Sequence, residues 1–137
     1  MNNKGKNFVT LMLFIAVFAF FLRVGIEQIM RVTIAQNESN AQSTLRLIGI
    51  ALENYAKDNR GIYPASLTAL TQTKPPYLDK DYTAHSPVKG YIYSCPRLEQ
   101  TGYNCYAAPS KCKITGKTVF SVTSGSPIIP EPCDQKE

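Results

Sequence analysis

The feature that most constrains this chain is a proline-free stretch, residues 8–55, in which an apolar run is followed by an amphipathic pattern. Residues 8–22 contain one hydroxyl, that of Thr10, and no charged side chain. In residues 41–56 apolar side chains recur at spacings of three and four, which places them on one face of a helix. The first proline is Pro64, so nothing before it forbids a continuous helix. The stretch predicts one long helix with an apolar half and an amphipathic half.

The apolar half reaches across a bilayer only if it includes two charged residues. Residues 8–22 would span roughly 22 Å as a helix, whereas the hydrocarbon core is about 30 Å thick. Extension to Met30 gives roughly 34 Å and includes Arg23 and Glu27, one helical turn apart and able to pair. A signal peptide is the alternative, but no small-x-small cleavage site follows Leu22. We expect an uncleaved transmembrane helix over residues 6–31, anchored by Phe8, Leu11, Phe14, Ile15, Phe18 and Phe21.

Charge and cysteine content narrow the possible functions of the remainder. Residues 1–31 hold four basic side chains and one acidic one, so the remaining 106 residues carry only +2 of the net +5, too little to indicate nucleic-acid binding. All four cysteines follow the apolar segment, and their even number predicts two disulfides in an oxidising compartment. The alternative, free or metal-bound thiols, is disfavoured because no C-x-x-C pair occurs and His85 is the only histidine. The cysteines are Cys95, Cys105, Cys112 and Cys133.

The residues after the long helix predict one small α+β domain over residues 32–137. Asn59, Gly61 and Pro64 end the helix 32–58, and a loop over residues 59–87 follows. From residue 88 the apolar period changes to two, which predicts an antiparallel meander over residues 88–123 and a C-terminal tail over 124–137. The apolar face of so small a sheet is expected to pack on the long helix, at Leu45, Ile48, Leu52 and Tyr55.

The predicted hairpin also bears on the pairing of the cysteines. Cys95 and Cys105 are equidistant in sequence from Gln100, so a simple hairpin would place them opposite one another. That pairing leaves Cys112 with Cys133. The other two connectivities stay open at this point.

The order and spacing of several short motifs resemble a type IV pilin or a type II secretion pseudopilin. The motifs are Lys4-Gly5 before the apolar helix, Asn37-Glu-Ser39, Leu45-Arg-Leu-Ile48, Asn59-Arg-Gly-Ile-Tyr-Pro64, Pro75-Pro-Tyr-Leu78 and Gly90-Tyr-Ile-Tyr93. The resemblance implies a non-enzymatic structural subunit without cofactor. Its N-terminal helix would bundle with those of other pilin subunits, in a homopolymer or a heteropolymer, in a filament or fimbrium.

The same resemblance implies a processing route and a location. Residues 1–5 would be a short basic leader, cleaved between Gly5 and Lys6 by a prepilin peptidase, with methylation of the new amino terminus. Before an assembly machinery extracts it, the subunit would sit in the bacterial inner membrane, N-terminus cytoplasmic and C-terminal domain periplasmic. After assembly it would belong to an extracellular filament.

Four residues depart from the family pattern. Lys6 stands where Phe or Met is usual, Thr10 where the family carries a glutamate, and Glu27 where a kinking proline is common. Arg23 adds a charge to a normally apolar stretch. These departures favour a minor or tip subunit, and an unprocessed pilin-like membrane protein is a further possibility.

Enzymatic and binding functions have weaker support in the sequence. His85 stands alone in a loop, and Asp79 and Asp81 are too few for a calcium site, so no catalytic or metal-binding residue is expected. The tyrosines between residues 77 and 106 are interpreted mainly as core and sheet packing. The alternative function is a single-pass membrane protein whose disulfide-bonded extracytoplasmic domain binds a ligand or partner and does not polymerise.

Overall fold

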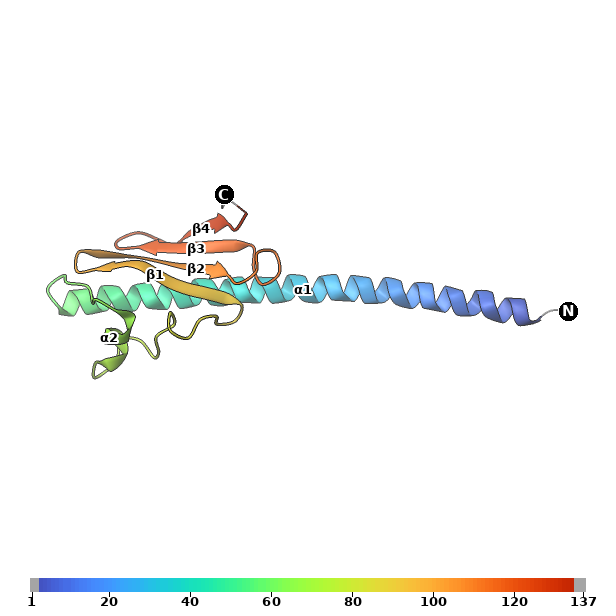
Figure 1. Ribbon diagram of the computed structural model, residues 1–137, viewed down its shortest axis with the longest axis horizontal. Coiled ribbons are helices and arrows are strands. Elements are labelled where there is room, and N and C mark those ends of the chain that lie inside the picture. Colours follow the sequence, from blue (N-terminus) through green and yellow to red (C-terminus); the bar gives the residue numbers. More distant parts are fainter. Residues whose placement is uncertain (1–2, 135–137) are drawn as a thin grey trace. The chain divides into compact units, whose positions relative to one another are not determined.

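A computed structural model describes residues 3–134, and its elements follow the order helix, helix and four strands (Figure 1). The expected α+β class is confirmed, with a long N-terminal helix, an antiparallel sheet and two disulfides. By its internal contacts the chain divides into two units between Thr33 and Ile34, two residues beyond the boundary expected from hydropathy. The elements are α1 (Asn3–Asp58), α2 (Leu67–Gln72), β1 (Tyr91–Glu99), β2 (Gly102–Pro109), β3 (Thr118–Thr123) and β4 (Ile129–Pro132).

Helix α1 is a single helix that runs through the boundary between the two units. It ends where the sequence provides capping residues: the Asn59 side chain donates to the carbonyl of Tyr55 at 2.8 Å. Gly61 then adopts φ +83° and donates its N–H to the carbonyl of Ala56 at 2.7 Å. A left-handed glycine that satisfies a terminal carbonyl is a common helix ending, so α1 ends at the predicted place.

The sheet is an antiparallel meander with strand order β1-β2-β3-β4. Glu99 pairs with Gly102, so β1 and β2 are joined by a two-residue turn at Gln100 and Thr101. The register shifts by one residue between Ser94 and Arg97, where Pro96 lies in the edge strand. A bulge at an edge is a position at which a strand tolerates a proline that cannot donate to its neighbour.

The C-terminal segment contains a fourth strand where the sequence predicted only a tail. Strand β4 pairs with β3 and carries Pro130 and Pro132. The N–H of Cys133 donates to the carbonyl of Lys117 at 2.9 Å, so the backbone of Cys133 faces β3. Because only every second residue of an antiparallel strand bonds to a given neighbour, residues 130 and 132 face outward from β3. Both prolines lie at those outward positions of an edge strand, where the missing N–H costs no ladder hydrogen bond.

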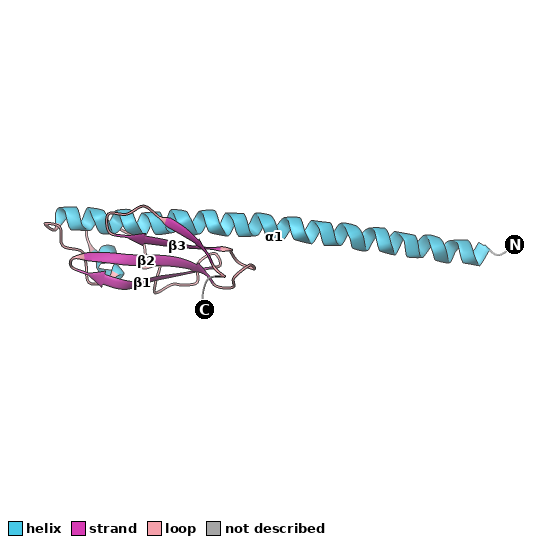
Figure 2. Cartoon of the chain, turned by 90° about the horizontal axis from the view of Figure 1, so that it is seen from above, coloured by secondary structure: helices cyan, strands magenta, loops and turns pink. Residues whose placement is uncertain are grey.

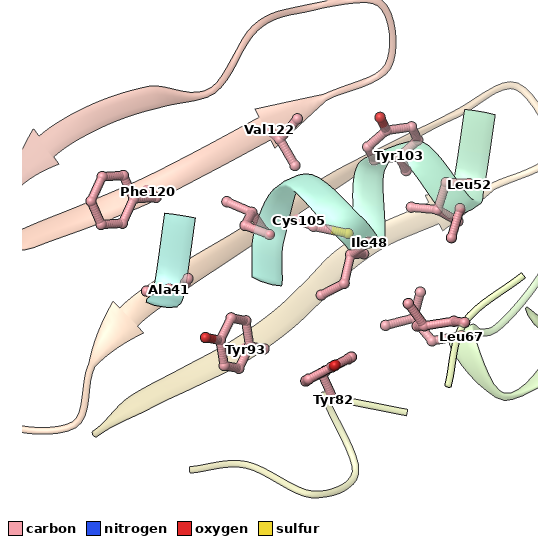
Figure 3. Packing of buried hydrophobic residues seen from close by; sticks show 14 of the residues in the cluster. Ala41, Ile48, Leu52, Leu67, Tyr82, Tyr93, Tyr103, Cys105, Phe120 and Val122 are labelled. Atoms are coloured by element: carbon pink, nitrogen blue, oxygen red, sulfur yellow. The ribbon is translucent and has the colours of Figure 1, made fainter. Parts of the chain in front are cut away.

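The core of the second unit lies between α1 and one face of the sheet (Figures 2 and 3). Alternate residues of β1, β2 and β3 point at the helix, as the period of two requires, whereas β4 is exposed throughout. Leu67, Leu70, Leu78 and Tyr82, from α2 and the loop after it, close one flank. The helix contributes Ala41, Leu45, Ile48, Ala51 and Leu52, and the strands contribute Tyr91, Tyr93, Tyr103, Cys105, Ala107, Phe120 and Val122.

Both disulfides join residues of this unit. Cys95 in β1 is bonded to Cys105 in β2, and Cys112 is bonded to Cys133 after β4. This is the pairing that the symmetry of the hairpin favoured. The two bonds fasten the first hairpin and the C-terminal end of the sheet.

Candidate functional site

The apolar segment of α1 exposes nearly every large side chain it carries. The six expected anchor residues, Phe8, Leu11, Phe14, Ile15, Phe18 and Phe21, are each between 56% and 69% exposed. Exposed large apolar side chains continue to Val32, and the segment meets the length and composition criteria for a membrane span. Burial of one such side chain is favourable by about 1.5 to 3 kcal/mol, so transfer of this surface from water to an apolar environment is strongly favoured.

Arg23 and Glu27 lie within this segment and face each other along the helix. The Arg23 Nε atom is 3.9 Å from Glu27 Oε1, and both side chains are more than half exposed. An i,i+4 pair in water contributes only about 0.3 to 0.5 kcal/mol. In an apolar medium the same pair matters more, because each charge reduces the cost of burying the other.

Thr10 lies near the start of α1, at the position where the resemblance to pilins would place a carboxylate. The Thr10 hydroxyl donates to the carbonyl of Lys6 at 2.7 Å, within the helix itself. The backbone of Gly5 is helical, and Met1 and Asn2 of the expected leader lie outside the described residues. At Thr10 the chain therefore offers a hydroxyl bonded to its own backbone and no negative charge.

Three of the four expected helix–sheet contact residues lie at the centre of the core. Leu45, Ile48 and Leu52 are fully buried against the sheet. Tyr55 is half-buried, and its ring meets that of Tyr77 edge to face at 5.6 Å. One turn beyond Leu52 the same helical face therefore packs on the loop after α2, and Tyr55 contributes there.

One carboxylate that sequence reasoning did not single out ties α1 to three other parts of the domain. Glu53 Oε2 accepts a hydrogen bond from the Tyr63 hydroxyl at 2.9 Å, and Oε1 accepts from the Tyr103 hydroxyl at 3.1 Å. Oε1 also accepts from the N–H of Gly125 at 3.3 Å. Burial and the nearby carboxylate raise the pKa of the Tyr103 hydroxyl. These partners are distant from Glu53 in the sequence, so no local sequence pattern predicts the hydrogen bonds.

A groove of about 610 Å³ lies between the outward face of α1 and the loop after β3. We call it the helix–loop groove; it is lined by Arg46, Gly49, Ile50 and Glu53 of α1 and by Gly125–Ile128 of the loop, among others. Ile50, which lines the groove, is 51% exposed, and Leu47, elsewhere on the same helix, is 52% exposed. The domain thus presents large apolar side chains on the helix face opposite its own core.

The second groove, about 530 Å³ in volume, lies on the sheet face that points away from α1. We call it the outer-sheet groove; it is lined by Asn104, Tyr106, Val119, Ser121, Glu131 and Pro132, among others. Tyr106 is half-buried there, in contrast to the buried tyrosines of the inner face. This surface combines one aromatic ring with a few polar groups.

The titratable residues that could support chemistry are engaged in local structure. Burial raises the pKa of Asp81, but hydrogen bonds from Thr83, Ala84 and Thr68 outweigh it and leave the pKa below its ordinary value. The Asp79 carboxylate accepts from the Tyr82 hydroxyl, and a ring nitrogen of His85 lies 2.7 Å from the carbonyl of Asp81. These carboxylates cap and brace the loop after α2.

Among the described residues, one cluster has the spacing of a metal site, formed by Cys112, Cys133 and Asp134. The two sulfurs are joined in a disulfide and so offer no thiolate.

Comparison of the chain with models of protein families, with curated proteins and with solved structures gives no match.

Proposed function

We propose that this chain is a membrane-anchored, pilin-like structural subunit that assembles through its long helix, as in a type IV pilus or a type II secretion pseudopilus. The observation that carries the proposal is the continuity of α1, which is exposed and predominantly apolar over residues 8–32 and then packs in the core of a disulfide-bonded domain. One helix therefore joins a membrane-soluble segment directly to a folded domain. A subunit of this kind can be stored in a membrane and transferred to a helical bundle without refolding.

The exposed helix face of the second unit supports assembly over a solitary role. Leu47 and Ile50 are exposed on α1, outside the core that the helix forms with the sheet, and Ile50 lines the helix–loop groove. Packing against a neighbouring helix would remove both side chains from water. The two disulfides support a location for the domain outside the cytoplasm, the periplasmic side of a bacterial inner membrane.

The amino end supports a minor or tip position. In a bundle, an amino group freed by cleavage between Gly5 and Lys6 needs a negative partner in a medium of low dielectric constant. Thr10 supplies none, because its hydroxyl donates to the carbonyl of Lys6. We infer that the subunit depends on a partner with a carboxylate, or on a position that keeps its amino end near lipid headgroups.

Photo-crosslinking in intact bacteria tests the assembly. Benzoylphenylalanine at Phe14, which is 69% exposed, is expected to give crosslinked products at multiples of the subunit mass. The matched control places the same probe at Ile92, 42% exposed on the outer sheet face, where monomer should dominate. Crosslinks from Phe14 to lipid alone would contradict assembly through the helix.

A pair of isoleucine substitutions tests the helix face of the domain. Ile50→Lys is expected to abolish incorporation into oligomers while the domain stays folded, because it places a charge on the face proposed to pack. Ile62→Lys is the control, since Ile62 is 48% exposed just beyond the end of α1. Equal assembly of the two variants would refute the role of this face.

The alternative function is a single-pass membrane protein that binds a ligand or partner through its outer domain and does not polymerise. The outer-sheet groove is the observation that favours it. Substitution of Tyr106 by Ala would then abolish binding of the partner, and neither the Phe14 crosslinks nor the Ile50 effect would be seen.

A further inference from the structure

The segment that joins β2 to β3 combines an exposed apolar side chain with three lysines. We call residues 111–117 the basic loop; its sequence is Lys111-Cys-Lys-Ile-Thr-Gly-Lys117. Ile114 is 58% exposed, and all three lysines are exposed. A single exposed isoleucine is ordinary on a protein surface, so its significance depends on how the loop holds it and where the loop lies.

The basic loop is closed by hydrogen bonds and by a disulfide. The N–H of Lys113 donates to the carbonyl of Gly116 at 2.7 Å, and the N–H of Thr115 donates to the carbonyl of Lys111 at 2.9 Å. Cys112 is bonded to Cys133 at the end of β4. An added Cβ at Gly116 would collide with the buried ring of Tyr91, so the backbone there lies directly on the core. Ile114 is therefore held outward by a turn that has little freedom to fold it back.

The basic loop lies beside the first turns of α1 within the second unit (Figure 1). The Asn37 side chain donates to the carbonyl of Thr115 at 2.9 Å, and Glu38 Oε1 accepts from the N–H of Lys117 at 2.8 Å. A fourth lysine joins this end of the domain, because Lys89 Nζ lies 3.4 Å from the Asn40 side-chain oxygen.

This end of the domain is also where the chain leaves the apolar segment. The last of its exposed large apolar side chains is that of Val32, five residues before Asn37. The residues between Val32 and Asn37 belong to α1.

The charges at this end are predominantly positive. Lys113 Nζ forms an ion pair with Asp134 at 2.9 Å, and Glu38 is the other acidic side chain bonded to the loop. Within residues 3–134, Lys89, Lys111 and Lys117 take part in no ion pair. Three lysines are thus available to anionic groups around the exposed isoleucine.

We propose that the basic loop docks on an anionic lipid surface, with Ile114 in the headgroup region and the lysines on lipid phosphates. The inference rests on the proposed membrane anchoring and adds a second contact, made by the folded domain itself. A juxtamembrane lysine contributes about a five-fold gain in binding to an anionic surface. Neutralisation of Lys111 and Lys117 together should then reduce the docked population relative to the undocked one by roughly 30-fold. The contact would hold the unassembled subunit close to its membrane and would be lost on extraction.

The test uses a tryptophan introduced by substitution, which gives a unique fluorescence signal because the chain contains no tryptophan of its own. Full-length Ile114→Trp protein is reconstituted in vesicles of phosphatidylcholine alone and in vesicles rich in phosphatidylglycerol. In the anionic vesicles we expect a blue-shifted emission, protection from acrylamide, and quenching by lipids brominated near the headgroup. High salt and the added Lys111→Gln and Lys117→Gln substitutions should reverse all three effects.

The matched control is Ile62→Trp, which places the same ring at a similarly exposed isoleucine beyond the other end of the domain helix. It should stay accessible to acrylamide in every vesicle. Protein that floats with the vesicles but shows the same accessibility at positions 114 and 62 would overturn the docking and leave the anchor intact. Protection at position 114 that does not depend on lipid charge would likewise overturn the docking. Protein that fails to float would overturn the anchor, and the docking with it.

Discussion

A pair of leucines on α1 allows the packing of the helix to be tested with one chemical change. Leu52 is fully buried against the sheet, whereas Leu47, five residues earlier on the same helix, is 52% exposed. Leu52→Ala removes three carbon groups, which is about 2.4 kcal/mol of transfer free energy at roughly 0.8 kcal/mol per group. A void of roughly 80 Å³ that does not relax adds about 2 kcal/mol. The free energy of unfolding should therefore fall by about 2 to 5 kcal/mol, and Leu47→Ala should change it by less than about 1 kcal/mol.

The assay follows guanidinium unfolding of the full-length chain in detergent micelles by near-ultraviolet circular dichroism. All eight tyrosines lie between residues 55 and 106, and no tryptophan is present, so the tyrosine band reports the second unit, whereas the phenylalanines of the anchor contribute at shorter wavelength. The free-energy difference comes from the shift in midpoint at constant slope. Equal losses for the two variants, or a larger loss for Leu47→Ala, would refute the assignment of the buried face.

Individual contacts give four further predictions. Alkylation of the unreduced native protein should add no mass, and labelling of two cysteines would contradict the disulfides. Removal of Cys112 together with its partner should lower the free energy of unfolding by roughly 2 to 4 kcal/mol. Glu53→Ala should lower the free energy of unfolding by about 1 to 3 kcal/mol, because the buried Tyr103 hydroxyl loses its acceptor, and Glu53→Gln should lower it less. An equal loss for the two variants in chemical denaturation would exclude the hydrogen bond as the cause. Burial raises the pKa of Tyr91 to about 12 from an ordinary value of 10.0. As the pH rises, this hydroxyl therefore ionises in the unfolded chain before it ionises in the folded one. Its contribution to the free energy of unfolding is complete below pH 10 and is lost as the pH rises toward 12. Other tyrosines, Tyr103 among them, also have a raised pKa, so Tyr91→Phe should remove one tyrosine equivalent from the late part of the tyrosinate absorbance titration and leave the remainder. Thr10→Glu, in a processed subunit, should increase the share of protein recovered in filaments by sedimentation, and long regular filaments of the wild type alone would contradict the electrostatic argument.

The helix and the first hairpin could be predicted because their determinants are local. Apolar spacing in residues 41–56 identified the buried face, and the absence of proline before Pro64 allowed α1 to continue unbroken. Symmetry about Gln100 favoured the pairing of Cys95 with Cys105 and left the other two connectivities open, and the structure decides for that pairing. The one-residue bulge at Pro96 was not foreseen, because a bulge depends on how the edge of a sheet adapts to a residue that cannot donate.

Strand β4 shows where local propensity gives way to long-range pairing. Its sequence, Ile-Pro-Glu-Pro, argues against a strand, and the tail expected there is the main error of the sequence-based prediction of the fold. The segment pairs because β3 offers an open edge and both prolines lie at outward positions. Neither condition is visible before the sheet exists.

The side chains that brace and extend the domain were decided by tertiary structure alone. Glu53 bonds to partners 10, 50 and 72 residues away, and Asn37 reaches the basic loop 78 residues further along the chain. No pattern of period two or 3.6 encodes such contacts, because they form only after the sheet has packed on α1. The sequence by itself determined an apolar helix, an amphipathic helix and a hairpin, since each depends on neighbours within a few residues, whereas the disulfide connectivity was decided by the structure. The exposed face around Ile50 and the placement of Ile114 beside the start of the domain depend on which surfaces the core leaves uncovered.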